Sequence, residues 1–130
     1  MILEQRLRLA FKQFLSNSVS GDLLKLIKDS IKPADVEMLI RMIESLKDPS
    51  VYCKNDDDRE TVSGFFLFID FVSALLINLG DSAIQELNSY RNTKHPFVPW
   101  VIKYVNDKRF HDEIMSKFSE IFADDLAEKA

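Results

Sequence analysis

The chain alternates between stretches with one apolar side and short polar breaks. Residues 2 to 16 place apolar side chains at helical spacing, at Leu3, Leu7, Ala10 and Phe14. A second helix follows Ser20 to Asp22, which supply N-cap chemistry, and it ends at Lys32-Pro33 because the residue before a proline avoids the helical region. A third helix begins at Pro33 and closes before Asp48-Pro49. The N-terminal part therefore predicts three amphipathic helices.

The stretch from Val62 to Leu79 has a different pattern. Its apolar residues cover most of the circumference of a helix, at Phe65, Phe66, Phe68, Ile69, Phe71, Val72, Leu75, Leu76, Ile77 and Leu79. A helix that is apolar nearly all round lies inside a protein. The polar residues 48 to 58 before it predict an exposed loop, with Asp57 or Asp58 as the N-cap, and Gly80 is the expected C-terminal stop.

The same stretch reaches the lower length limit for crossing a bilayer. Asp70 stands at its middle, however, and Ser63, Asp70, Ser73 and Asn78 fall within roughly 140 degrees on a helical wheel, as on a helix with one wet side. An ionised carboxylate near the bilayer midplane is costly. We therefore expect no membrane span, and the end of the chain at Glu128-Lys129-Ala130 predicts no C-terminal anchor.

The remaining residues predict three further helices. Ser82 and Gln85 have the spacing of a capping box that opens a helix over 82 to 91, a short helix covers 97 to 105, and a last helix covers 107 to 127. The chain of 130 residues has the usual length of one domain and shows no internal repeat or linker. The expected fold is a single all-α domain, residues 1 to 130, in which about seven helices form a compact bundle around the central hydrophobic helix.

Composition and charge exclude several classes of partner and ligand. A net charge of -4 makes nucleic acid an unlikely partner, since phosphate binding requires a basic surface. The single cysteine, Cys53, cannot form an internal disulfide, which indicates a reducing compartment and a cytoplasmic location. Neither His95 nor His111 stands at metal-ligand spacing with Cys53 or with the other histidine. The acidic run before Arg59 lacks the glycine and glutamate of a calcium loop.

The motifs of enzymes are also missing from the sequence. No glycine-rich phosphate cradle or nucleophile elbow occurs, and we interpret Asp70 as a carboxylate on a wet side of its helix or paired with a nearby Lys or Arg. We therefore expect no metal, no cofactor and no enzymatic activity. The expected mode of action is the binding of another protein.

Two segments match a known family in their order and spacing. Val62-Ser63-Gly64-Phe65-Phe66 is similar to the end of the family's first homology motif, where its central helix starts. Pro99-Trp100-Val101, followed by Phe110 ten residues after Trp100, resembles the second motif. Over about residues 58 to 118 the chain resembles the Bcl-2 family of apoptosis regulators. The resemblance implies a bundle whose amphipathic helices form a groove for a partner's helix.

The sequence departs from the family's motifs at several positions. Asp58 to Thr61 stand where the family has Asn-Trp-Gly-Arg, so the arginine that pairs with the ligand's aspartate is not at its usual position, and the candidates to replace it are Arg59 and Arg41. Val105-Asn106-Asp107 replace the Gly-Gly-Trp of the second motif. Divergent, compact members without a membrane anchor are typical of viral homologues.

The resemblance also implies a binding site. An amphipathic ligand helix presents anchors at i, i+3, i+4 and i+7 to an apolar groove. The third helix and the start of the fourth would wall this groove, with Arg59 for the ligand's acid and an apolar lining of Leu39, Met42, Ile43, Leu46, Val62, Phe65 and Phe68. For each apolar residue, a place in an ordinary core is the alternative.

The expected function is that of a Bcl-2-like, viral inhibitor of apoptosis that sequesters pro-apoptotic ligand helices. Its location would then be the host cytoplasm, with peripheral association with mitochondria. The alternative is a helical adaptor or chaperone-like module, homodimeric and unrelated to apoptosis, whose exposed apolar surface binds a different client. The ligand and the oligomeric state stay open at this point.

Overall fold

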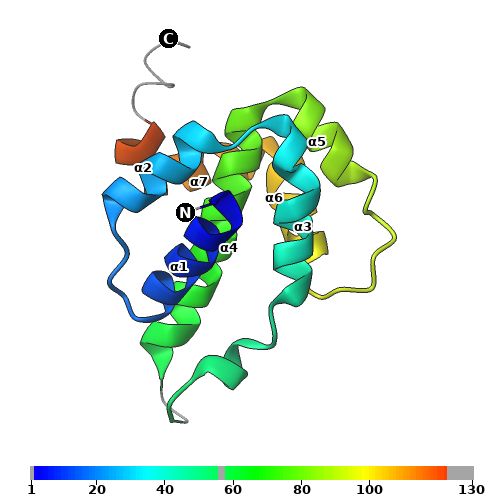
Figure 1. The fold of residues 1–130 in the computed structure, drawn as a ribbon. Coiled ribbons are helices and arrows are strands. Elements are labelled where there is room, and N and C mark those ends of the chain that lie inside the picture. Colours follow the sequence, from blue (N-terminus) through cyan, green and yellow to red (C-terminus); the bar gives the residue numbers. More distant parts are fainter. Residues whose placement is uncertain (1, 56–57, 123–130) are drawn as a thin grey trace.

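The computed structural model describes residues 2–55 and 58–122, which contain α-helices and 3-10 helices and no β-strand (Figure 1). In chain order these elements are α1 (Leu3–Leu15), α2 (Gly21–Ser30), η1 (Pro33–Asp35), α3 (Val36–Ser45), η2 (Pro49–Tyr52), α4 (Arg59–Leu79), α5 (Asp81–Asn88), α6 (Val98–Asn106) and α7 (Lys108–Lys117). The expected all-α bundle is confirmed.

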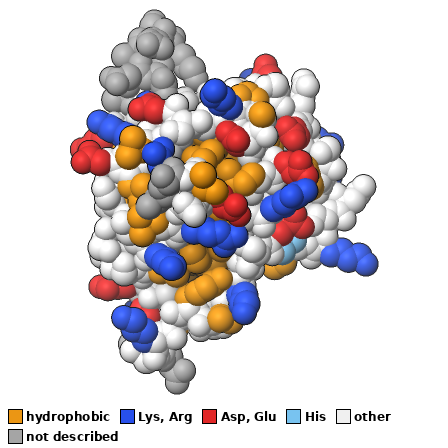
Figure 2. Space-filling view, viewed as in Figure 1, with side chains coloured by type: hydrophobic (Ala, Val, Ile, Leu, Met, Phe, Trp, Pro, Cys, Tyr) orange, Lys and Arg blue, Asp and Glu red, His pale blue; other side chains and the backbone are white. Residues whose placement is uncertain are grey.

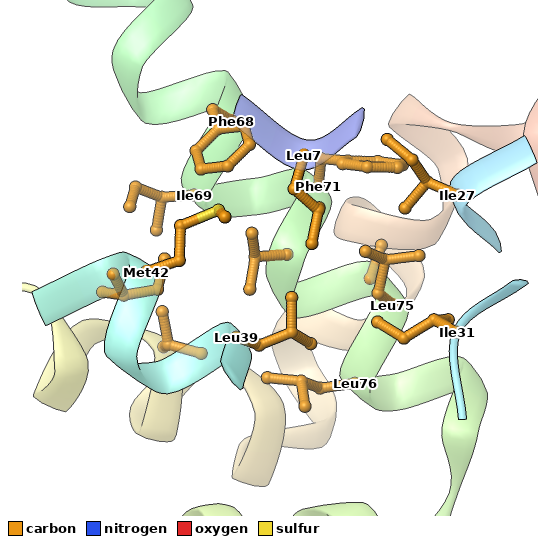
Figure 3. Packing of buried hydrophobic residues seen from close by; sticks show 14 of the residues in the cluster. Leu7, Ile27, Ile31, Leu39, Met42, Phe68, Ile69, Phe71, Leu75 and Leu76 are labelled. Carbon is orange, nitrogen blue, oxygen red and sulfur yellow. The ribbon is translucent and has the colours of Figure 1, made fainter. Parts of the chain in front are cut away.

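Helix α4 runs through the middle of the molecule and packs against α1, α5, α6, α7 and η2 (Figure 1). Phe65, Phe68 and Phe71 on α4 are fully buried. Figure 3 shows Leu7 of α1, Ile27 of α2 and Leu39 of α3 pointing toward the apolar side chains of α4. Each large apolar side chain that is removed from water stabilises the fold by roughly 2 kcal/mol. The prediction of a central buried hydrophobic helix is therefore confirmed.

The two ends of α4 follow the local rules that the sequence indicated. At its start, Asp58 is the N-cap, and its carboxylate accepts hydrogen bonds from the backbone N–H of Thr61 at 3.2 Å and from the Thr61 hydroxyl at 2.7 Å. The hydroxyl bond is the largest reason why the pKa of Asp58 is lowered. At its end, Gly80 has a φ of 96°, a conformation that L side chains rarely adopt. Residue 57, the alternative N-cap, lies outside the described residues.

Three boundaries differ from the sequence-based expectations. The predicted exposed loop contains η2, which Asp48 caps through the backbone N–H of Ser50 and which begins at Pro49, and the ring of Tyr52 docks edge-on against Phe11 at 5.3 Å between ring centroids. The predicted capping box does not form: α5 begins at Asp81 directly after Gly80, with no side-chain cap. Helix α7 ends at Lys117, and a turn at Phe118 interrupts the predicted last helix, whose residues 123 to 127 lie outside the described part.

Length and apolarity alone make α4 a candidate membrane span, the one such helix among the described residues. The core helix of a soluble protein meets the same criterion, and 56% of the most apolar window of α4 is buried inside the bundle. The absence of a membrane span therefore stays a prediction.

Candidate functional site

Most of the residues that the sequence assigned to a groove lie in the core. The residues that are less than a tenth exposed are Leu39, Met42, Ile43, Leu46, Phe65 and Phe68. Figure 3 shows Leu39 and Met42 directed from α3 into the core. The cavity beside Leu39 and Ile43 measures about 10 Å³, which is about the space of one water molecule. A groove lined by these side chains would require α3 to move away from α4, so their role in ligand binding stays a prediction.

The surface over α1 and α3 agrees with this packing. Figure 2 shows hydrophobic side chains in several groups on this face, separated by Lys, Arg, Asp and Glu side chains. Arg41 on α3, the alternative to Arg59, forms an exposed ion pair with Glu37 one helical turn earlier. This face therefore carries no continuous apolar channel along α3 in the described residues.

The other two predicted residues, Arg59 and Val62, lie on an outward side of α4 that its neighbours leave partly uncovered. We call this side the α4 strip; its residues are Arg59, Val62, Ser63, Phe66, Leu67 and Asp70. A hollow of about 560 Å³ borders the strip toward Val19, after α1, and another of about 640 Å³ borders it toward Pro49 and Phe97. All six strip residues line the first hollow, and Val62 and Phe66 also line the second, so these two side chains form a ridge between the two depressions.

A row of aromatic rings continues the strip onto α6 and α7. Trp100 stacks on Phe66 at 5.6 Å between centroids, Tyr104 meets Trp100 edge-on at 6.1 Å, and Phe110 meets Tyr104 at 5.1 Å. Trp100 is 47% exposed and Leu67 is 36% exposed, which is high for such large apolar side chains. The two segments that carry the family resemblance therefore come into direct contact through Phe66 and Trp100.

An ion pair closes the far end of the strip. The Nζ atom of Lys117 on α7 lies 2.8 Å from a carboxylate oxygen of Asp70. The hydrogen bond to Asp70 raises the pKa of Lys117, while burial followed by the charge of Asp70 raises the pKa of Tyr104. The interpretation of Asp70 as a carboxylate paired with a basic side chain is confirmed.

Sequence reasoning missed Phe66 and Leu67 as surface residues, and it did not include Trp100 in the site. A signal was present, because positions 59, 62, 63, 66, 67 and 70 share one side of a helix. Their apolar members did not stand out, since apolar residues surround α4 on every side. Only the arrangement of the neighbouring helices distinguishes the uncovered side.

Cys53, His95 and His111, the side chains that could act as nucleophiles or metal ligands, make contacts that serve the fold. Burial, followed by the charges of Asp58 and Asp48, raises the pKa of the Cys53 thiol, which favours the unreactive protonated form. The Nδ1 atom of His95 accepts a hydrogen bond from the backbone N–H of Phe97, and Nε2 of His111 bonds the carbonyl of Val105. Within residues 2–55 and 58–122, no His, Cys, Asp and Glu side chains gather in a group of three or more suited to a metal ion.

Comparisons of the chain with protein-family models, with curated proteins and with solved structures give no match. The α4 strip is therefore defined by the structure alone: it is a partly exposed side of the central helix of an all-α bundle, with Val62, Phe66 and Leu67 as its apolar members.

Proposed function

We propose that this protein binds an amphipathic helix of another protein along the α4 strip and acts as a Bcl-2-like inhibitor of apoptosis. The observation that carries the proposal is the stack of Phe66 on the half-exposed Trp100, with Leu67 exposed beside it. Tryptophan and other aromatic side chains are enriched among the residues that contribute most to protein–protein binding. The exposure of Trp100 on α6 and of Leu67 on the central helix favours a binding surface over a purely structural role.

The spacing of the strip suits a helical ligand. Val62, Phe66 and Asp70 follow one another at intervals of four residues, and Arg59 to Asp70 span about 16 Å of helix axis. An amphipathic ligand presents its own anchors at i, i+3, i+4 and i+7, which is the same repeat. The two flanking hollows, of about 560 and 640 Å³, provide space for the side chains of such a ligand on either side of the ridge.

The polar groups of the strip lie at its ends, where they would set the orientation of the ligand. Arg59 in the first turn of α4 is exposed, and the proposal assigns it to an acidic residue of the ligand. The Asp70–Lys117 pair lies at the opposite end. Between them Val62, Phe66 and Leu67 supply apolar contact, an arrangement typical of interfaces with an apolar centre and a polar rim.

The link to apoptosis rests on the family resemblance. The two similar segments, around Phe66 and around Trp100, meet at the strip. Sequestration of a pro-apoptotic helix there would place the protein in the host cytoplasm, peripheral to mitochondria. In the alternative function, a homodimeric adaptor, the same exposed rings would pack against a second copy of the chain.

Calorimetric titration with a panel of pro-apoptotic ligand-helix peptides tests the proposal. We expect at least one peptide to bind at micromolar concentration, and we expect Leu67→Asp on the strip to weaken its binding at least tenfold. Leu26→Asp is the matched control, because Leu26 is 50% exposed on α2, outside the strip. If no peptide binds and sedimentation at several concentrations shows a dimer that Leu67→Asp dissociates, the adaptor function replaces the proposed one.

A further inference from the structure

A small cavity lies where the α4 strip meets α6 and α7. Its volume is about 160 Å³, which suits one side chain rather than a helix. Its walls include the aromatic rings of Phe66, Trp100, Tyr104 and Phe110. Consecutive rings in this row differ in orientation: the planes of Phe66 and Trp100 are 28° apart, whereas those of Trp100 and Tyr104 are 86° apart. The cavity is therefore bounded by rings that lie in different planes.

The charged residues of the cavity leave an excess of negative charge. Asp70, Glu113 and Lys117 all line it. Lys117 lies 2.8 Å from Asp70 and neutralises that carboxylate. Glu113 forms no ion pair within the described part of the chain, although its charge contributes to raising the pKa of both Lys117 and Tyr104. Among the residues that line the cavity, one carboxylate is thus left for a positively charged ligand, and a further cation, Lys103, lies beside the Phe110 ring.

Aromatic rings and a carboxylate favour the same kind of ligand. A cation is attracted to the face of an aromatic ring by the ring's quadrupole, most strongly for tryptophan. The Phe110 ring already has the Nζ atom of Lys103 at 6.0 Å from its centroid, an arrangement of this type. A neutral apolar side chain would gain the contact with the rings but would leave the charge of Glu113, an exposed side chain, without an opposite charge. The cavity therefore suits a side chain with an apolar stem and a positive head.

We propose that this cavity binds an arginine side chain of the partner helix. The inference rests on the proposed function and adds the chemistry of one ligand position to it. Arginine fits better than lysine because its planar guanidinium stacks on aromatic rings and offers several N–H donors to a carboxylate such as that of Glu113. Lys117 competes for the same carboxylates, so its pair with Asp70 limits the affinity of the cavity.

The first test uses N-acetyl-arginine amide as the probe and the fluorescence of Trp100, the single tryptophan of the chain, as the readout. We expect a saturable change with this probe and none with N-acetyl-citrulline amide, which has nearly the same shape without the charge. Equal responses to the two compounds would overturn the proposal. Saturable arginine binding together with failure of every helix peptide would count against a helical partner while retaining the preference for a cation.

Three variants sharpen the test. Glu113→Gln should lower the affinity for the arginine probe about threefold, which is the range expected for an exposed charge pair. Lys117→Gln should raise this affinity by a similar factor, because Asp70 then loses its partner. A gain of affinity does not result from a damaged fold. Glu86→Gln on α5, outside the cavity, is the matched control and should leave the affinity unchanged. Unaltered affinity in both Glu113→Gln and Lys117→Gln would contradict the proposed site.

Discussion

Gly64 of α4 lies against the backbone of Phe14 in α1, so closely that a Cβ atom at Gly64 would stand 2.0 Å from the Phe14 carbonyl oxygen. The Thr61 hydroxyl, one turn earlier, lies 3.3 Å from the carbonyl oxygen of Leu15. The last turn of α1 is therefore fixed on one side of the start of α4. This contact leaves Val62 and Phe66 on a side that α1 does not cover.

Gly64→Ala is expected to destabilise the protein by about 3 kcal/mol, because the methyl group meets backbone rather than a movable side chain. Gly21→Ala is the matched control: the nearest atom to a Cβ atom there is Cδ1 of Ile121 at 4.0 Å, and alanine favours the helix. Urea unfolding followed by circular dichroism measures both variants. Equal unfolding midpoints for the two variants would contradict the close helix contact.

Leu39→Ala and Leu67→Ala separate the core from the α4 strip. Leu39 is 1% exposed, so its truncation should cost about 3 kcal/mol of stability, whereas truncation of the exposed Leu67 should cost under about 1 kcal/mol. Peptide affinity, measured where both variants are folded, should fall only for Leu67→Ala. The reverse result, with affinity lost in Leu39→Ala, would support the groove on α3 that the sequence predicted.

Arg59→Glu is expected to weaken binding of an acidic ligand helix about tenfold without changing the circular dichroism spectrum, since the residue is exposed in the first turn of α4. Arg41→Glu provides the comparison, because Arg41 is exposed on α3 beside Glu37 and away from the strip. Calorimetric titration measures both affinities. A loss of affinity confined to Arg41→Glu would indicate that the acidic residue of the ligand pairs with Arg41 on α3 instead.

The start of α7 gives a prediction for the dependence of stability on pH. Hydrogen bonds from the guanidinium and then from the backbone N–H of Arg109 lower the pKa of Asp107 to about 2. Because this pKa is lower in the folded than in the unfolded chain, the stabilisation is present above about pH 4 and is lost as the pH falls toward 2.

Asp107→Asn keeps an N-cap residue but removes the titration. The melting temperature of the natural protein should therefore fall more steeply between pH 5 and pH 2 than that of the variant, as measured by differential scanning fluorimetry. Parallel curves would show that the Asp107–Arg109 contact contributes nothing to acid stability.

The amino-acid sequence by itself determined the helices, because their signals are local. Apolar spacing outlines α1 to α4, the Asp58 carboxylate caps α4, and Gly80 ends it with a φ that other residues avoid. Local signals do not reveal contacts between residues that are far apart in the chain. The ring of Tyr52 docks on Phe11, about forty residues away in the chain, and no pattern within residues 48 to 58 reveals this contact.

Only the tertiary structure decided which side of α4 is free. A helix with apolar residues all round gives no internal sign of which of them will be covered, so the sequence could not distinguish Phe65, which is buried, from Phe66, which is partly exposed. That distinction depends on the close approach of α1 at Gly64 and on the position of Trp100 on α6. Both are contacts between helices, formed when the bundle closes around α4.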